Sequence, residues 1–294
     1  MNNSIKRGLG YNIVNALIYI FVGLLSLLCI IPFFNVISVS ISSNNAVVSN
    51  QVWFLPKEIT FNAYKTVLGD PSMMRSFGFT VVITILFTLL GLFLTICAAY
   101  ALSRSRMKGR LAINTMFVFT MYFGAGLIPD YLLMDTLNLL DTTAVLILPL
   151  AISAYNMIIL RTAMQAIPSS LEEAAQLDGC NDFRILCQIY LPLVVPTLAT
   201  LALFYAVGRW NSYSDAMYYI QSDELKPLQL KLYNLVSASA DSAALEGDGG
   251  TGTQTNEEVI KSATIMFATL PIIIVYPFLQ KYFVSGVMIG AVKE

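Results

Sequence analysis

Residues 76–102 read SFGFTVVITILFTLLGLFLTICAAYAL and contain no charged side chain. A helix needs about 20 predominantly apolar residues to cross the hydrocarbon core of a bilayer, and this run is longer than that. The bilayer core offers no water to satisfy free backbone groups, so a run of this kind spans the membrane as a helix. The stretch therefore predicts an all-α integral membrane protein.

Other apolar stretches extend this prediction to a helical bundle. The chain of 294 residues is 56% hydrophobic and 12% charged, and its mean hydropathy is +0.69, which exceeds what a soluble core of this length uses. We expect six transmembrane helices, at about residues 11–41, 76–102, 111–133, 144–164, 189–210 and 262–284. The long polar segments between them are loops, and a Gly- and Thr-rich run at 243–256 is expected to be a mobile outer loop.

The polar segment 42–74 separates the first predicted helix from the rest. We therefore expect two parts, residues 1–74 with the first transmembrane helix and an extracytoplasmic loop, and residues 75–294 as the core transmembrane domain. Four cations between Arg104 and Arg110 follow the second predicted span. Because cationic loops stay in the cytoplasm, this cluster places both termini on the cytoplasmic side of the cell membrane.

The side-chain inventory excludes several kinds of chemistry. Histidine is absent, and the four cysteines lack the spacing of a metal site or a disulfide framework, so we expect no metal and no catalytic residue. The balance of 17 basic and 18 acidic residues gives no reason to expect nucleic acid. No phosphate-binding motif is present. The central thirds of the predicted spans lack Asp, Glu, Lys and Arg, which disfavours a carrier coupled to protons or sodium.

A polar segment at 168–192, which we call the elbow, lies between the fourth and fifth predicted spans on the cytoplasmic side. Ser169 with Glu172, or Ser170 with Glu173, fits a capping box that starts a helix at about residue 170. Gly179 is placed to end that helix in the left-handed conformation, and a second helical piece begins at 182. From periodicity alone the elbow fits an ordinary interfacial linker equally well. The two small side chains of Ala174 and Ala175 favour a surface that another protein approaches closely.

Seven positions of the elbow resemble the signature loop of ABC importer permeases, and they match it without a gap: Glu173, Ala174, Ala175, Gly179, Ile189, Leu191 and Pro192. The resemblance implies that the elbow is a coupling helix, which docks on a separate ATP-binding subunit and passes its closure to the spans. Glu172 and Asp178 adjoin the motif and are included in this predicted coupling surface.

Residues 75–294 are similar to the carbohydrate-uptake branch of these permeases, of the multiple-sugar and oligosaccharide type. The resemblance rests on AAYALSR at 98–104, GLIP at 126–129, YNMIILRT at 155–162, WN at 210–211 and FVSGVMIGAVK at 283–293. It implies the type I importer fold and import of an oligosaccharide by alternating access. A permease for another solute, such as a peptide or polyamine, or a stand-alone secondary transporter, is the alternative.

The resemblance also implies partners: a second, different permease chain, two cytosolic ATP-binding subunits that hold ATP and Mg²⁺, an extracytoplasmic solute-binding protein, and membrane lipid. This chain itself would be no enzyme and bind no cofactor. Sugars are recognised by aromatic faces and by amide or hydroxyl groups. The candidate pathway residues are therefore Tyr122, Tyr155, Asn156, Tyr205, Trp210, Asn211 and Tyr213. Asn156 fits an interhelical hydrogen bond equally well, and Trp210 fits an interfacial aromatic belt.

Overall fold

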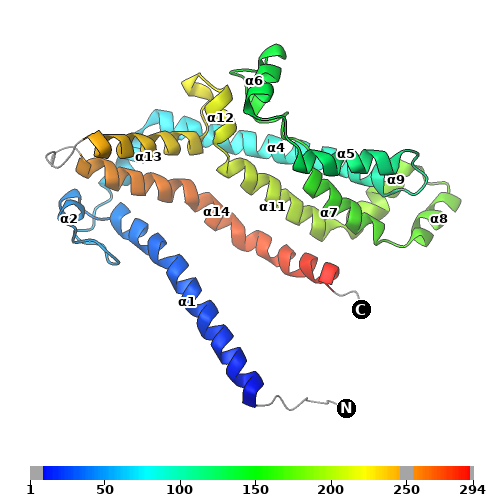
Figure 1. The fold of residues 1–294 in the computed structure, drawn as a ribbon, viewed down its shortest axis with the longest axis horizontal. Helices are drawn as coiled ribbons and strands as arrows, with labels where there is room; N and C mark the ends of the chain where they lie inside the picture. Colours follow the sequence, from blue (N-terminus) through cyan, green and yellow to red (C-terminus); the bar gives the residue numbers. More distant parts are fainter. Residues whose placement is uncertain (1–8, 246–253, 292–294) are drawn as a thin grey trace. The chain divides into compact units, whose positions relative to one another are not determined.

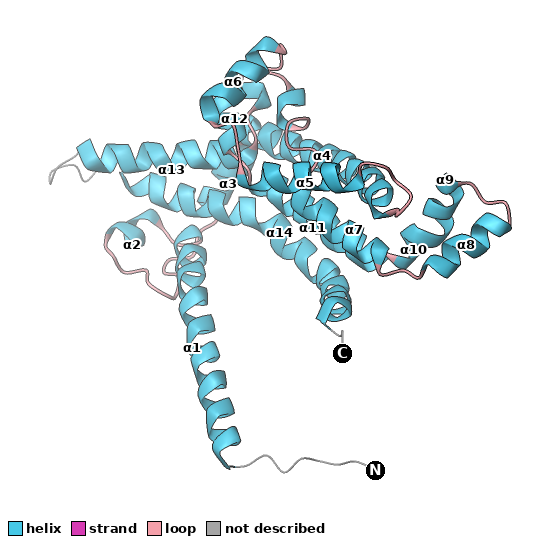
Figure 2. Ribbon diagram, turned by 45° about the vertical axis from the view of Figure 1, so that its right-hand side comes forward, coloured by secondary structure: helices cyan, strands magenta, loops and turns pink. Residues whose placement is uncertain are grey.

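The computed structural model describes residues 9–245 and 254–291, and the described residues form helices and loops without a strand (Figure 2). The all-α prediction is confirmed. Most of the Gly- and Thr-rich run at 243–256 lies outside the described residues. The chain forms two compact units, one up to Asp70 with Leu235–Phe267 and one of Pro71–Asn234 with the residues from Ala268 on. The predicted division at 74/75 stays a prediction.

Unit one contains α1 (Leu9–Ser40), α2 (Asn44–Val48) and α3 (Asn62–Gly69), together with parts of α13 (Leu228–Leu245) and α14 (Gln254–Ala291) (Figure 1). The buried Ser42 joins the end of α1 to the following loop, because its hydroxyl donates to Ser38 O at 2.6 Å and accepts from Lys57 N at 3.1 Å. A cavity of about 480 Å³ in this unit is lined by Ser42, Ser43, Asn44, Asn45, Thr60, Asn62, Ala63, Thr66, Val259 and Ile260.

Unit two is built around α4, which packs against α7 and α11. Its helices are α4 Pro71–Ser103, α5 Arg110–Tyr122, α6 Leu127–Thr136, α7 Ala154–Gln165, α8 Ser169–Leu177, α9 Asp182–Ile185, α10 Leu191–Leu193, α11 Val195–Asn211 and α12 Ser214–Tyr219. Single turns of other helix types lie at Thr143–Leu146 (η1), Leu186–Tyr190 (η2, a π-helical turn) and Asp223–Leu225 (η3).

Three described helices are long and apolar enough to cross a membrane, over Ile13–Ser40, Pro71–Ser103 and Glu257–Pro277. Two bent pairs meet the same test together, and counting each as one span gives up to five. The predictions of helices at 11–41, 76–102 and 262–284 are confirmed as continuous helices. The total of six transmembrane helices stays a prediction.

The other three predicted spans are not continuous helices, and each break has a local cause. The span at 111–133 bends by 116° between α5 and α6, where Gly126 adopts φ +94°. In the span at 144–164, a helix begins only at Ala154, after Pro149, with the Ser153 hydroxyl as its cap at 3.3 Å from Asn156 N. The span at 189–210 bends by 83° just before α11, whose second residue is Pro196.

Tyr205 fixes the packing of α4, α7 and α11. Its hydroxyl lies 2.7 Å from Thr95 Oγ1 on α4 and accepts from Ser153 N at 3.0 Å at the start of α7. Its ring packs edge-on to Phe87, with the centroids 5.7 Å apart. A Cβ at Gly91 would lie 2.9 Å from Tyr205 Cε1 and 3.0 Å from Ala151 O, so α4 and α11 need a glycine at this contact.

A clamp at Asp141 joins the loop after α6 to the loop after α12. The Asp141 carboxylate accepts from the backbone N–H of Gln221 at 3.0 Å, and from the backbone N–H and hydroxyl of Ser222 at 2.9 and 2.5 Å. These hydrogen bonds, that of the Ser222 hydroxyl foremost, lower the pKa of Asp141. The clamp is therefore intact at neutral pH and is lost only as the pH falls through that lowered pKa.

We predict that Gly91→Ala destabilises the protein by about 1–3 kcal/mol, because the added methyl overpacks the contact with Tyr205 and the Ala151 carbonyl. Thermal unfolding of the purified protein in detergent measures the change. Gly78→Ala is the matched control, since Gly78 lies on the same helix with no atom within 4 Å of its would-be Cβ. Equal melting temperatures for the two variants would contradict the tight contact.

Candidate functional site

The elbow is a short helix, a glycine turn and a second helical piece, as predicted from the sequence. α8 ends at Leu177, and Gly179 follows with φ +79°. Gly179 N–H donates to Gln176 O at 3.0 Å and Cys180 N–H donates to Ala175 O at 2.9 Å, which is the Schellman pattern. The Asn181 side chain then caps α9. The predicted left-handed glycine is confirmed.

The predicted capping box is wrong. α8 begins at Ser169, with Pro168 at the cap position and no side-chain hydrogen bond there. The Glu172 side chain, which the capping box requires at the helix start, instead forms an ion pair with Arg104 from the end of α4. A charge-assisted pair with a buried arginine is stronger than a cap on an exposed N–H, so the distant partner determines where this side chain points.

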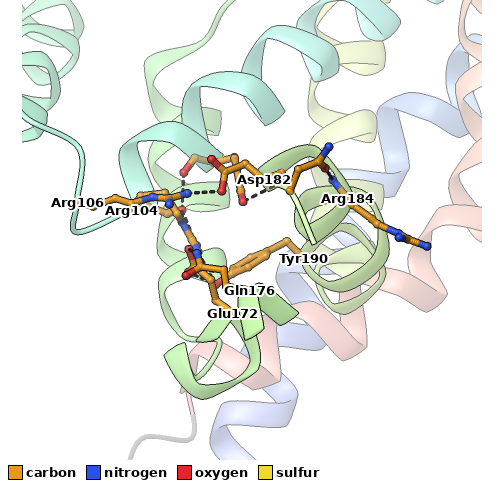
Figure 3. Close-up of polar contacts among 10 residues, drawn as sticks. Arg104, Arg106, Glu172, Gln176, Asp182, Arg184 and Tyr190 are labelled. Carbon is orange, nitrogen blue, oxygen red and sulfur yellow. Dashed lines mark hydrogen bonds and ion pairs between the residues drawn. The ribbon is translucent and has the colours of Figure 1, made fainter. Parts of the chain in front are cut away.

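Arg104 is the centre of the site (Figure 3). Its guanidinium donates to Glu172, to the Tyr190 hydroxyl at 2.5 Å and to the Ser103 hydroxyl at 2.9 and 3.0 Å. It also lies over two rings, 4.0 Å from the centroid of Tyr190 and 4.9 Å from that of Tyr100. The Tyr190 hydroxyl donates to Glu172 at 3.3 Å. We call Arg104, Glu172 and Tyr190 the arginine cluster.

A second contact holds α9 to the loop after α4. Arg106 pairs with Asp182, and the Tyr100 hydroxyl donates to Asp182 O at 3.1 Å. The hydrogen bond to Asp182 raises the pKa of Arg106, which stays protonated at physiological pH. The last turn of α4 and the loop after it therefore contact both helical pieces of the elbow.

Burial separates the two ion pairs in strength. The Arg106 and Asp182 side chains are 54% and 58% exposed, and pairs of that kind contribute about 0–1 kcal/mol. The Arg104 and Glu172 side chains are only 8% and 16% exposed, and removing one partner of a buried pair costs about 3–5 kcal/mol. The arginine cluster is therefore the attachment that positions the elbow.

The predicted coupling residues divide between an inner and an outer face. Ala175 is buried, Glu172 lies in the arginine cluster, and Ile189 and Leu191 pack partly buried against the core around Met164. The residues on the outer face are exposed: Glu173, Ala174, Asp178, Gly179 and Pro192. Two large apolar side chains that the sequence did not single out are also exposed, Leu177 at 89% and Phe183 at 73%.

A cavity of about 410 Å³ opens beside the arginine cluster. It is lined by Ser103, Arg104, Ser105, Arg106, Met164, Gln165, Ile167, Ser169, Glu172, Glu173, Gln176 and Tyr190. The lining comes from the ends of α4 and α7 and from the elbow. The cavity combines two arginines, two glutamates and two amides, so it is a polar recess.

The seven candidate pathway residues are not brought together. Tyr122 and Tyr155 are 77% and 55% exposed. Asn156 and Tyr205 are buried, and the Tyr205 hydroxyl is fully used within the chain. The other three have partners of their own: Trp210 Nε1 donates to Ala268 O, Asn211 Nδ2 donates to Val207 O, and Tyr213 stacks on Tyr233. None of the seven lines either cavity, and their contact with substrate stays a prediction.

Sequence reasoning missed two buried arginines. Arg104 enters the sequence analysis through the cationic cluster and the resemblance at 98–104, not as a site residue, although Tyr100 lies one helical turn before it and is a signal that the guanidinium could stack. Arg209 lies in the last turn of α11 and is only 2% exposed; it pairs with Asp215 and donates to Leu146 O at 2.9 Å. Arg104 and Glu172 lie 68 residues apart, and Arg209 and Asp215 lie on either side of the loop between α11 and α12. Patterns within a single helix do not reveal pairs of this kind.

The known proteins that this chain is similar to are membrane components of transport systems. Residues 111–289 match the family described as "Binding-protein-dependent transport system inner membrane component". The chain is 40% identical to the polygalacturonan/rhamnogalacturonan transport system permease protein YtcP of Bacillus subtilis, covering 94% of this chain and 97% of that one. It is 27% identical to the arabinooligosaccharides transport system permease protein AraQ of Bacillus subtilis, over 96% and 97% of the two chains.

A solved structure is similar over nearly the whole chain. It is a bacterial ABC transporter involved in the import of the acidic polysaccharide alginate, and one of its chains superposes with a TM-score of 0.84 at 36% identity. The match covers 94% of this chain and 98% of that one.

We predict that Gly179→Val disrupts the turn of the elbow by about 1–3 kcal/mol, because a β-branched residue is strained at φ +79° although its Cβ would have space. Hydrogen exchange at the Cys180 amide, which closes the turn, should speed up by roughly 5–100-fold. Gly179→Asn is the control, since asparagine tolerates this conformation and should change exchange little. Identical exchange in the two variants would rule out a strained turn.

Proposed function

The chain belongs to the family of binding-protein-dependent transport system inner membrane components, and on that premise we propose that it is the permease subunit of an ATP-driven importer of oligosaccharides. Members of this family are transport components of the membrane and not catalysts. The observation that carries the proposal is the elbow, where the signature positions of importer permeases form a helix-glycine-helix unit with an exposed outer face. The sugar class is supported by the relatives, whose names specify polygalacturonan or rhamnogalacturonan, arabinooligosaccharides and alginate.

Energy enters through the outer face of the elbow. Leu177 and Phe183 expose large apolar surfaces on the same segment as the acidic Glu173, a combination that suits insertion into a cleft of another protein. The partner is a pair of cytosolic ATP-binding subunits that hold ATP and Mg²⁺. Their closure moves the elbow, and this chain binds neither cofactor nor metal.

The permease works as one chain of a larger membrane assembly. Six spans place both termini and the elbow in the cytoplasm, with 1–74 as the first span and outer loop and 75–294 as the core. A second, different permease chain completes the pathway. A solute-binding protein delivers the oligosaccharide from outside, and the spans alternate between inward-facing and outward-facing states. Tyr122, Tyr155, Asn156, Tyr205, Trp210, Asn211 and Tyr213 stay candidate contacts in states that open between the two permeases.

Acidic oligosaccharides are the first substrates to test, because the solved neighbour at 36% identity imports an acidic polysaccharide. The experiment uses the complete transporter in proteoliposomes with its binding protein and labelled tri-galacturonate, a neutral arabinotriose and a tripeptide. We expect ATP-dependent uptake of the acidic sugar. Uptake of the tripeptide without either sugar would overturn the substrate class, and uptake without the ATP-binding subunits would overturn the importer.

We predict that Leu177→Ser lowers ATP-dependent uptake by about 10–100-fold, since central apolar contacts of an interface contribute about 1–3 kcal/mol each. Co-purification of the ATP-binding subunits with the tagged permease should fall in parallel. Leu193→Ser is the matched control, an exposed leucine on α10 that is not one of the signature positions. Wild-type uptake in Leu177→Ser would remove this side chain from the docking surface.

A further inference from the structure

The two adjacent glutamates of the elbow face different neighbours. Glu173 is exposed and lines the recess beside the arginine cluster, whereas Glu172 is mostly buried and pairs with Arg104 at the end of α4. Resting on the proposed function, we propose that Arg104 is a positioning residue that transmits the movement of the elbow to α4. Glu173 then belongs to the docking surface, and Glu172 belongs to the link behind it.

The contacts of Arg104 make this link stiff. Its guanidinium bonds to α8 through Glu172 and to η2 through Tyr190 (Figure 3). Ser103 and the Tyr100 ring hold it from α4 itself. A guanidinium is planar, so partners bonded in its plane and a ring stacked on its face together fix its position and its tilt. The Tyr190 side chain is 1% exposed and packs edge-on to Tyr100, with centroids 5.5 Å apart. The elbow therefore cannot shift far without moving the last turn of α4.

The covalent connections of the elbow are less suited to transmit movement. On one side, the helix of α7 ends at Gln165, and a three-residue turn with Pro168 leads into α8. On the other side, a π-helical turn and an 83° bend at Val194 separate α9 from α11. Helix breaks of this kind absorb movement because their backbone geometry can change locally.

α4 is in a position to pass the movement on. It is one unbroken helix from Pro71 to Ser103, and it packs along both α7 and α11. The close contact of Gly91 with Tyr205 and the hydrogen bond of Thr95 with Tyr205 leave little slack between α4 and α11. A displacement at Ser103 is thus carried as a rigid body through the core of unit two. The route from the ATP-binding subunits to the spans runs through Arg104.

The link is tested by two spin labels in the complete transporter in nanodiscs, one at Ala101→Cys on α4 and one at Ser170→Cys on α8. Both positions are exposed, and the four native cysteines are replaced first. Pulsed electron spin resonance gives the distance between the labels with and without ATP, using a hydrolysis-deficient ATP-binding subunit. In the wild-type background we expect the distance to stay constant, because both labels move together. In Arg104→Gln we expect it to change when ATP binds.

Function provides a second readout, the number of sugar molecules taken up per ATP hydrolysed. We predict that Arg104→Gln and Glu172→Gln each lower this ratio by about 10-fold, and that the double variant is no worse than either alone because they act as one link. Arg104→Lys keeps the charge but loses the planar guanidinium, so its uptake ratio should lie between those of the wild type and Arg104→Gln. Arg106→Gln is the matched control at the exposed pair, with less than a 2-fold change.

The outcomes separate the link from the proposed function. Failure of the wild-type complex to take up any oligosaccharide would overturn the proposed function, whatever the distances show. A working wild-type complex with an unchanged ratio and a constant distance in Arg104→Gln would overturn the link alone. If the Arg104→Gln complex does not assemble, the link is tested with Arg104→Lys and Tyr190→Phe instead. Wild-type ratios of sugar uptake to ATP hydrolysis in both variants would also overturn the link.

Discussion

A buried charge determines how the elbow of this permease is held against α4. Burying an arginine is expensive unless its hydrogen bonds and its charge are matched, and Arg104 achieves this with one carboxylate, two hydroxyls and two aromatic rings. These partners come from α4, from α8 and from the π-helical turn after α9. The charge can be satisfied only when all three segments meet. The position of the elbow therefore follows from the need to neutralise one guanidinium.

The other end of unit two follows the same rule. Arg209 lies in the last turn of α11 and is neutralised by Asp215, whose carboxylate also accepts from Ser212, while the Leu146 carbonyl accepts from the guanidinium. Between the two buried pairs, α4, α7 and α11 pack through apolar side chains and the Tyr205 hydroxyl. Ionic contacts thus lie at the ends of the helices, and neutral contacts lie between them. A helix core of this kind can move as a body, because no charge has to be exposed or reburied midway.

Local signals in the sequence predicted the features that depend on local physics. The long apolar runs predicted α1, α4 and α14, and Gly179 predicted the left-handed turn, because each depends on the chain near it. The capping box failed because Glu172 found a stronger partner 68 residues earlier in the chain. The helix expected from 144 failed because Pro149 delays its start, although hydropathy counts the residues as apolar. The two buried arginines were missed because their partners lie across loops or between helices distant in the sequence.

Apolar exposure has different meanings on the spans and on the elbow. Leu89 and Phe93 on α4 are each 62% exposed, but lipid tails are as apolar as these side chains, so their exposure gives no drive to bind protein. Leu177 and Phe183 lie on an elbow that carries Glu173, Asp178, Asp182 and Arg184, and such a segment lies in water or at its edge. There, exposed apolar area is costly until a partner covers it, at about 25 cal/mol per Å². The hydrophobic effect therefore favours association at the elbow, and the arginine cluster holds the elbow that carries this surface in place.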